Sequence, residues 1–185
     1  MRGRFVAVVG PSGAGKDSLI RFAQTHLEGC DDVAFVRRVV TRPADSASED
    51  HDSMDLAGFA AAEAAGAFVL SWNAHGLRYG LPIALEDDLA EGRLVVANLS
   101  RDAISELVAR YPDALTVAVT AAPEVIARRL AARGRESAES IQNRLARSGG
   151  ERLPANAVRI DNSGALEIAG QQFLRLLRDV AGMRV

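Results

Sequence analysis

The feature that most constrains the fold of this chain is a glycine-rich turn that directly follows an apolar run near the N-terminus. Residues 5–9 read Phe-Val-Ala-Val-Val, and residues 10–18 read Gly-Pro-Ser-Gly-Ala-Gly-Lys-Asp-Ser. A short apolar run of this kind is typical of a buried parallel strand, and a helical pattern begins at Lys16. The pattern G-x-x-x-x-G-K between a strand and a helix predicts a phosphate-binding loop.

The residue types in this turn suit the binding of a nucleoside triphosphate. Glycines let successive backbone N–H groups point inward around a phosphate, and the start of the helix adds its positive dipole end. Lys16 is the only lysine among 22 basic residues, and a compact point charge suits this position better than a planar guanidinium. An ordinary glycine turn with an incidental lysine is the alternative. The candidate ATP contacts are Gly10, Pro11, Ser12, Gly13, Ala14, Gly15, Lys16, Asp17 and Ser18.

The loop departs from the usual pattern at Asp17, where Ser or Thr commonly supplies a hydroxyl to Mg²⁺. A carboxylate is a good ligand for a hard cation, so Asp17 could bind the ion directly. Ser18 could do so after a small shift of the backbone. The residues alone therefore leave both Asp17 and Ser18 as candidate magnesium ligands, with Asp17 favoured.

The rest of the chain alternates between strand-like and helix-like patterns. This alternation predicts an α/β sandwich with a mostly parallel sheet in a single domain, 1–185. A polar, acidic segment at 41–55 predicts a loop that opens a small insertion at about 35–82. The predicted strands lie at 5–9, 35–40, 68–72, 93–97, 115–119 and 157–160, and the predicted helices at 16–27, 56–65, 83–91, 101–110, 123–133, 138–147 and 165–183.

Composition excludes several classes of protein. With 48% hydrophobic and 25% charged residues the chain is not a disordered one, and no apolar run approaches the roughly 18 residues of a membrane span. A net charge of −2 argues against general binding to nucleic acid. The single cysteine, Cys30, and the absence of an export signal favour the cytoplasm. The oligomeric state stays open, with a homodimer among the alternatives.

A second cationic feature lies late in the chain. Six arginines fall between residues 128 and 147, on two helical patterns separated by Gly134. Phosphoryl transfer needs cations around the moving group, and a segment that closes over the site both supplies them and excludes water. With a phosphate loop upstream, the segment at about 128–148 predicts an arginine lid. A solvated pair of helices is the alternative.

In order and spacing these segments resemble the guanylate-kinase-like fold. The segments that carry the resemblance are the loop at 10–18, Val40-Thr41-Arg42-Pro43, Ser71-Trp72 followed by Tyr79-Gly80, the lid at 133–145 and Asp161-Asn162-Ser163-Gly164. Within that fold the chain is most similar to the ribose 1,5-bisphosphate phosphokinases of bacterial phosphonate degradation. That likeness rests on the Gly-Lys-Asp-Ser loop, Ser48-Glu49-Asp50-His51, the string at 70–80 and Arg133-Gly-Arg-Glu136.

The resemblance implies an activity and a set of site residues. It implies that ATP, with Mg²⁺, phosphorylates ribose 1,5-bisphosphate to 5-phospho-α-D-ribose 1-diphosphate (PRPP), releasing ADP, so the partner is a small phosphorylated sugar. The implied catalytic residues are Lys16, Arg133, Arg135 and Arg144. The implied substrate-binding residues are Arg38, Arg42, Ser71, Trp72, His75, Tyr79 and Asn98.

Departures from true guanylate kinases bear on the choice of substrate. The glutamate that reads guanine in those enzymes is replaced by Ser71, and an aspartate that helps to read guanine is replaced by Asn98. Losing both carboxylates removes the acceptors that guanine N–H groups require. Two alternatives stay open: a nucleoside monophosphate kinase with an altered pocket, and a catalytically silent module that binds a protein partner. Intact Lys16 and the lid arginines speak against the silent module.

Overall fold

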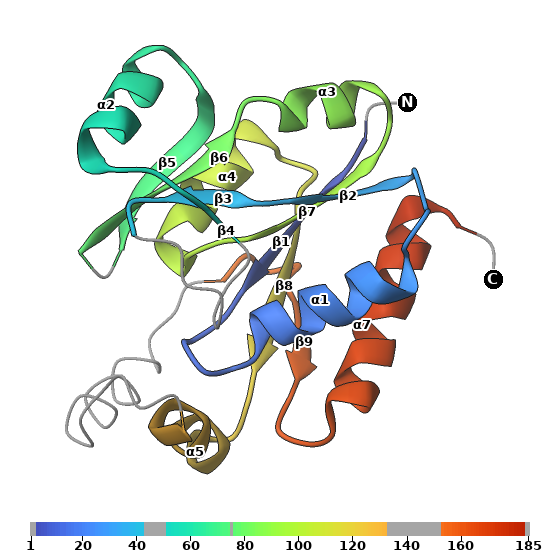
Figure 1. Ribbon diagram of the computed structural model, residues 1–185. Coiled ribbons are helices and arrows are strands. Elements are labelled where there is room, and N and C mark those ends of the chain that lie inside the picture. Colours follow the sequence, from blue (N-terminus) through green and yellow to red (C-terminus); the bar gives the residue numbers. More distant parts are fainter. Residues whose placement is uncertain (1–2, 43–50, 75, 133–152, 184–185) are drawn as a thin grey trace.

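A five-stranded parallel sheet forms the centre of the molecule (Figure 1). The computed structural model describes residues 3–42, 51–74, 76–132 and 153–183. Strand β1 lies in the middle of the sheet and is buried along its whole length. This arrangement confirms the predicted α/β class with a mostly parallel sheet. In spatial order the strands are β2 (Val33–Val36), β7 (Leu94–Asn98), β1 (Phe5–Val9), β8 (Leu115–Thr120) and β9 (Val158–Asp161).

Helices cover both faces of this sheet. Successive residues of β1 point to opposite faces, and all five are buried, so each face packs against a core. Val6 and Val8 face a core that contains residues of helices α1 (Lys16–His26) and α7 (Leu166–Ala181). Phe5, Ala7 and Val9 face a second core, which contains residues of α3 (Leu85–Ala90), the 3₁₀ turn η1 (Arg101–Ala103) and α4 (Ile104–Arg110). Helix α5 (Pro123–Ala132) follows β8 and packs Ile126 and Leu130 in a small cluster of their own.

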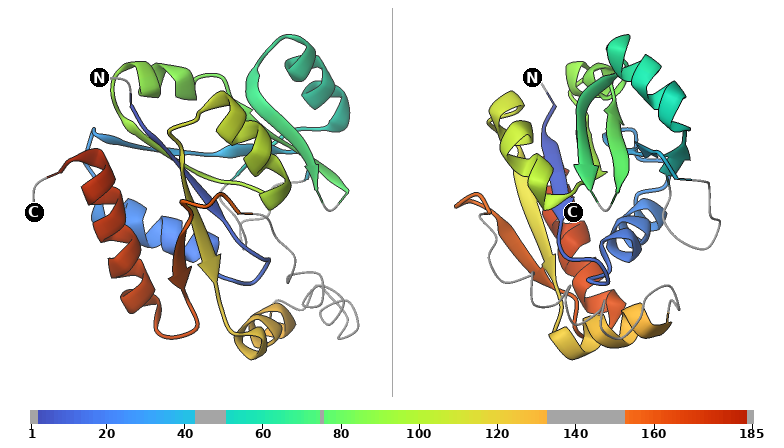
Figure 2. Two further views of the ribbon diagram at one scale, coloured as in Figure 1. Left: turned by 180° about the vertical axis from the view of Figure 1, so that it is seen from behind. Right: turned by 90° about the vertical axis from the view of Figure 1, so that its left-hand side faces the viewer.

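The insertion is a second, four-stranded sheet beside the first (Figure 2). Its strands β3 and β6 are antiparallel, as are β5 and β6, whereas β3 and β4 are parallel. Helix α2 (Leu56–Ala64) packs on it through Phe59, whose ring stacks on Phe68 at 4.7 Å. In spatial order the strands are β4 (His51–Ser53), β3 (Arg38–Val40), β6 (Leu77–Pro82) and β5 (Phe68–Ala74).

Two predictions for this region were wrong in detail. The single strand predicted at 35–40 is two strands, because the chain leaves the central sheet after Val36 and enters the second sheet at Arg38. The change falls at Arg37-Arg38, which interrupt the apolar run, but this interruption alone does not show that the chain passes to another sheet. The loop predicted at 41–55 contains β4, whose residues His51–Ser53 are strand only because they pair with β3. The helix predicted at 138–147 lies outside the described residues.

None of the helices that the structure describes is both long and apolar enough to cross a membrane.

Candidate active site

The phosphate loop connects β1 to α1 at the carboxyl end of the central sheet, where α/β folds bind their ligands. Gly10 and Gly15 both have positive φ, at 150° and 92°. A Cβ at Gly10 would lie 2.2 Å from the carbonyl oxygen of Val119, and one at Gly15 would lie 2.3 Å from Asn162 Nδ2. Both positions therefore require glycine, for conformation and for space.

Lys16 is the first residue of α1 and lies over the loop that precedes it. Its ammonium donates hydrogen bonds to the carbonyl oxygens of Gly10, at 2.9 Å, and Pro11, at 3.2 Å. The side chain thus runs back along the loop. A phosphate bound in the loop would meet both the ammonium and the N-terminus of α1.

Two residues from distant parts of the chain, Asn162 and Arg129, form hydrogen bonds to the backbone of the loop. The buried Asn162 donates from Nδ2 to the carbonyl oxygen of Ala14 at 2.8 Å. Arg129 of α5 donates from Nη2 to the carbonyl oxygen of Asn162 at 2.9 Å and from Nη1 to that of Ala14 at 3.3 Å. Sequence reasoning did not assign either residue to the site. Arg129 does lie in the segment that the sequence predicts as an arginine lid, and Asn162 belongs to the segment 161–164 that carries the resemblance.

Asp17, in the first turn of α1, lies against the end of β7. Strands β1 and β7 pair with Val8 opposite Asn98, so Asn98 is adjacent to the start of the loop. Its Nδ2 donates to Asp17 Oδ1 at 2.6 Å. Asn98 is only 5% exposed, whereas the next loop residue, Ser18, is exposed.

The residues at this end of the loop fit a magnesium ion that is shared with a nucleotide. Mg²⁺ is usually bound through one or two carboxylates together with substrate phosphates and waters. Asp17 supplies one carboxylate beside the phosphate loop. Within the described part of the chain no three His, Cys, Asp or Glu residues gather into a closed metal cage. A nucleotide-bound ion therefore suits this donor set better than a closed protein site.

A cavity of about 40 Å³ opens between α1 and the strands β2 and β3, next to Asp17. Its charged and amide lining comes from Asp17, Arg21, Gln24, Arg37, Arg38 and Asn98. Three guanidinium groups thus outnumber one carboxylate, although Arg37 also pairs with Asp52 at 3.1 Å. The lining favours an anionic ligand with hydroxyl or phosphate oxygens.

The structure brings together three of the predicted substrate-binding residues. Trp72 and Tyr79 lie opposite each other on β5 and β6, with rings stacked 5.4 Å apart and inclined by 8°. The guanidinium of Arg38, which is 7% exposed, lies 5.4 Å from the centre of the Tyr79 ring. Arg42 follows β3 and is half-buried.

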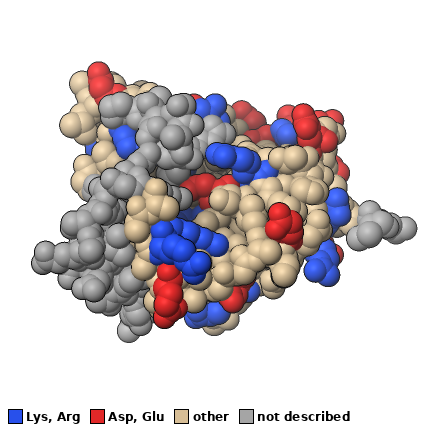
Figure 3. Space-filling model, turned by 60° about the horizontal axis from the view of Figure 1, so that its bottom comes forward, with Lys and Arg blue, Asp and Glu red and all other residues tan. Residues whose placement is uncertain are grey.

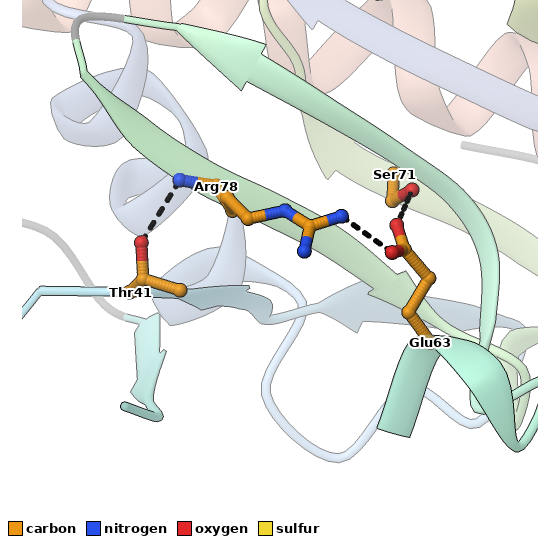
Figure 4. A network of polar contacts seen from close by, with 4 residues as sticks. All are labelled: Thr41, Glu63, Ser71 and Arg78. Atoms are coloured by element: carbon orange, nitrogen blue, oxygen red, sulfur yellow. Dashed lines mark hydrogen bonds and ion pairs between the residues drawn. The ribbon is translucent and has the colours of Figure 1, made fainter. Parts of the chain in front are cut away.

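Ser71 belongs to a different network, which Figure 4 shows. As the neighbour of Trp72 along a strand, it points to the opposite face of the sheet. Its hydroxyl donates to Glu63 Oε1 at 2.5 Å, and the guanidinium of Arg78 donates to the other oxygen of Glu63. The Arg78 backbone N–H donates to Thr41 Oγ1 at 2.9 Å. These hydrogen bonds, first from Ser71 and then from Arg78, lower the pKa of Glu63.

Glu63 was not predicted as a residue of this region. It is a lone carboxylate in the alanine-rich run at 60–65 of α2, which was the only signal in the sequence. Its carboxylate lies against Ser71, at the position where guanylate kinases were expected to carry glutamate. Each of its oxygens accepts a hydrogen bond from another side chain of this chain, Ser71 or Arg78.

The remaining predicted site residues, His75, Arg133, Arg135 and Arg144, lie outside the described part of the chain.

On the face shown in Figure 3, Lys and Arg side chains form separate groups with Asp and Glu between them.

No family model matches the chain. A guanylate kinase from Anaplasma phagocytophilum superposes with a TM-score of 0.71 at 16% sequence identity, covering 96% of this chain and 86% of that one. The chain therefore has the guanylate-kinase-like fold, with a phosphate loop before α1.

Sequence relatives identify the family within this fold. The chain is 48% identical over 181 residues to the ribose 1,5-bisphosphate phosphokinase PhnN of Brucella melitensis, covering 97% of this chain and 94% of the relative. A relative of the same name from Chelativorans sp. is 48% identical, covering 97% and 87%. In Cupriavidus necator a bifunctional ribose 1,5-bisphosphokinase-thymidine phosphorylase is 49% identical over 95% of this chain but only 29% of its own length. The chain belongs to the ribose 1,5-bisphosphate phosphokinase family.

Proposed function

We propose that this protein transfers the γ-phosphoryl group of ATP to the 1-phosphate of ribose 1,5-bisphosphate, forming PRPP and ADP in phosphonate catabolism. The observation that carries the proposal is the cavity beside the phosphate loop. Its three arginines suit a phosphorylated ligand better than guanine. Membership of the family, with an intact loop and Lys16, supports the same reaction.

The chemistry asks little of the protein beyond positioning and charge neutralisation. An oxygen of the acceptor 1-phosphate forms a bond to the γ-phosphorus while the bond from that phosphorus to the β–γ bridging oxygen breaks, and ADP leaves. The acceptor oxygen is already anionic, so no strong general base is needed. Lys16 holds the transferred phosphoryl group, and Arg133, Arg135 and Arg144 complete the cationic surroundings in the proposal.

In the proposed reaction, magnesium binds together with the nucleotide. When bound, the ion neutralises charge on the β- and γ-phosphates. Asp17 is the favoured ligand because its carboxylate is anchored by Asn98, and Ser18 is the alternative. Arg38, Arg42, Trp72, His75 and Tyr79 are the proposed sugar-phosphate contacts, and Ser71 acts with Glu63 at the edge of that region. We place the protein in the cytoplasm, and a homodimer stays a prediction.

A coupled assay of ADP release with a panel of acceptors tests this function. We expect kcat/KM for ribose 1,5-bisphosphate to exceed that for GMP and other nucleoside monophosphates by about 100-fold or more, because a site with mismatched polar groups discriminates strongly. Faster turnover of GMP would make the protein a nucleotide kinase instead. Binding of ATP without turnover of any acceptor would favour the silent binding module.

A further inference from the structure

Two residues in contact with each other, Asp17 and Asn98, both differ from the usual P-loop pattern. In P-loop enzymes the magnesium ion is commonly held by a Ser or Thr of the loop and by the Walker-B aspartate. Here the loop position is Asp17. Asn98 ends the strand that pairs directly with β1, and its amide reaches the loop, which is the location of a Walker-B residue. The carboxylate is thus on the loop, and the neutral side chain is on the strand.

The contact between the two side chains fixes how the amide is oriented. An ionised carboxylate only accepts hydrogen bonds, so the NH₂ group of Asn98 must face Asp17, as the 2.6 Å contact to Oδ1 shows. The other end of the amide, Oδ1, is buried and has no hydrogen-bond partner among the described residues. A buried polar atom in this condition points to a water or ion at the site.

The exchange preserves the charge of the pair. A hydroxyl with an aspartate carries one negative charge, and so does an aspartate with an asparagine. We propose that the carboxylate of the magnesium site has moved from the strand to the loop, so that Asp17 is the ligand and Asn98 is its positioning residue. Asn98 orients the carboxylate through Nδ2 and offers Oδ1 to a water on the ion, which Mg²⁺ commonly retains.

This inference rests on the proposed use of a magnesium nucleotide, but not on the identity of the acceptor. It also gives Asn98 a different role from a direct contact with the sugar. A positioning residue affects the ion's affinity, whereas a sugar contact affects KM for the acceptor. The two roles can therefore be separated by measurement.

The test compares the affinity for ADP with Mg²⁺ and with EDTA, measured by calorimetry on the full chain without any acceptor. The variants are Asp17→Ser, Asn98→Ala and the double exchange Asp17→Ser/Asn98→Asp, with the exposed Asn156→Ala as a matched control for loss of an amide. We expect wild type to bind ADP more tightly with Mg²⁺. Each single variant should lose about 10- to 100-fold of that enhancement, the range typical of lost ligands and their supporting groups.

The double exchange is the decisive arm. It restores the usual hydroxyl-and-aspartate arrangement, so we expect it to recover most of the magnesium enhancement that Asp17→Ser loses. Affinity for ADP in EDTA and the thermal midpoint report whether each variant is folded. If Asn98→Ala fails to fold, the double exchange, in which residue 98 keeps its shape, still decides the question.

Several results would overturn the inference. The losses of the single changes could persist in the folded double exchange, or Ser18→Ala could abolish the enhancement while Asp17→Ser keeps it. Asn98→Ala could also leave the enhancement intact and raise only KM for the sugar. A preference for GMP in the acceptor assay would refute the proposed function alone, whereas failure of wild type to bind ADP would refute both.

Discussion

At the scale of single residues, Gly15 meets two separate requirements. Its φ of 92° belongs to the left-handed region, and a Cβ would collide with Asn162, the side chain that also binds the carbonyl of Ala14. Gly29 has a similar φ of 78° but no atom within 4 Å of an added Cβ. Comparing the two positions separates backbone strain from the close approach of Asn162.

We expect Gly29→Ala to lower the free energy of unfolding by about 1 kcal/mol, the cost of the left-handed conformation. Gly15→Ala should cost more, because Asn162 must also move, and it should weaken ADP binding. Urea unfolding and calorimetry with ADP measure the two effects. Equal losses of stability at both positions, with unchanged ADP affinity, would show that the close contact does not matter.

Lys16 is the residue whose charge the proposed reaction needs most directly. Lys16→Ala should lower kcat by at least about 10²- to 10³-fold, the usual effect of removing one group that stabilises developing charge. The thermal midpoint should change little, because the side chain is only half-buried. Lys16→Arg controls for charge alone. Activity retained in Lys16→Ala would mean that this loop is not the site of phosphoryl transfer.

At the scale of secondary-structure elements, local patterns were predicted well and pairings between distant segments were not. The loop at 10–18 and the strand before it follow from adjacent residues. The hydrogen bonds that Arg129 and Asn162 donate to the loop do not follow from adjacent residues, because these two residues lie 115 and 148 residues from Ala14. The strand β4 and the contact between Glu63 and Arg78 likewise depend on partners that the sequence does not place side by side.

Glu63 connects α2 to both β5 and β6, and its lowered pKa makes that connection dependent on pH. A carboxyl group with a lower pKa in the folded state stabilises the fold above its unfolded value, near 4.5, and loses this contribution as pH falls through the folded value. We expect Glu63→Gln to be less stable than wild type at pH 7, with the difference shrinking below pH 4.5.

Urea unfolding at a series of pH values measures this difference. The exposed Glu28→Gln serves as a matched control for the loss of one negative charge. A difference between wild type and Glu63→Gln that stays constant from pH 7 down to the acid limit would contradict the role given to the ionised carboxylate.

At the scale of the whole molecule, the two sheets share one hydrophobic core. Phe5 and Val9 of the central sheet belong to the same cluster as Leu70 and Leu81 of the insertion. The sequence predicted one domain from its length and alternating pattern, but it could not show that the insertion shares this core. We therefore propose that residues 1–185 unfold as one unit.

The variant Leu70→Ala tests whether the chain unfolds as one unit. Leu70 is 2% exposed, so its truncation should lower the free energy of unfolding of the entire chain by about 2–5 kcal/mol. Scanning calorimetry should show a single transition in both proteins. Leu56→Ala in the same insertion, at a position 65% exposed, should cost less than about 0.5 kcal/mol. A separate early transition in Leu70→Ala would make the insertion an independent unit.

The central claim is that the 1-phosphate of a ribose bisphosphate is the acceptor, beside a phosphate loop with Lys16 and a cavity lined by arginines. Phosphorus-31 NMR of a reaction with ATP and ribose 1,5-bisphosphate tests it most directly. We expect the 1-phosphate resonance to be replaced by two mutually coupled diphosphate resonances, while the 5-phosphate resonance stays unchanged. Phosphorylation at the 5-phosphate, or conversion of GMP to GDP while ribose 1,5-bisphosphate stays intact, would contradict the account.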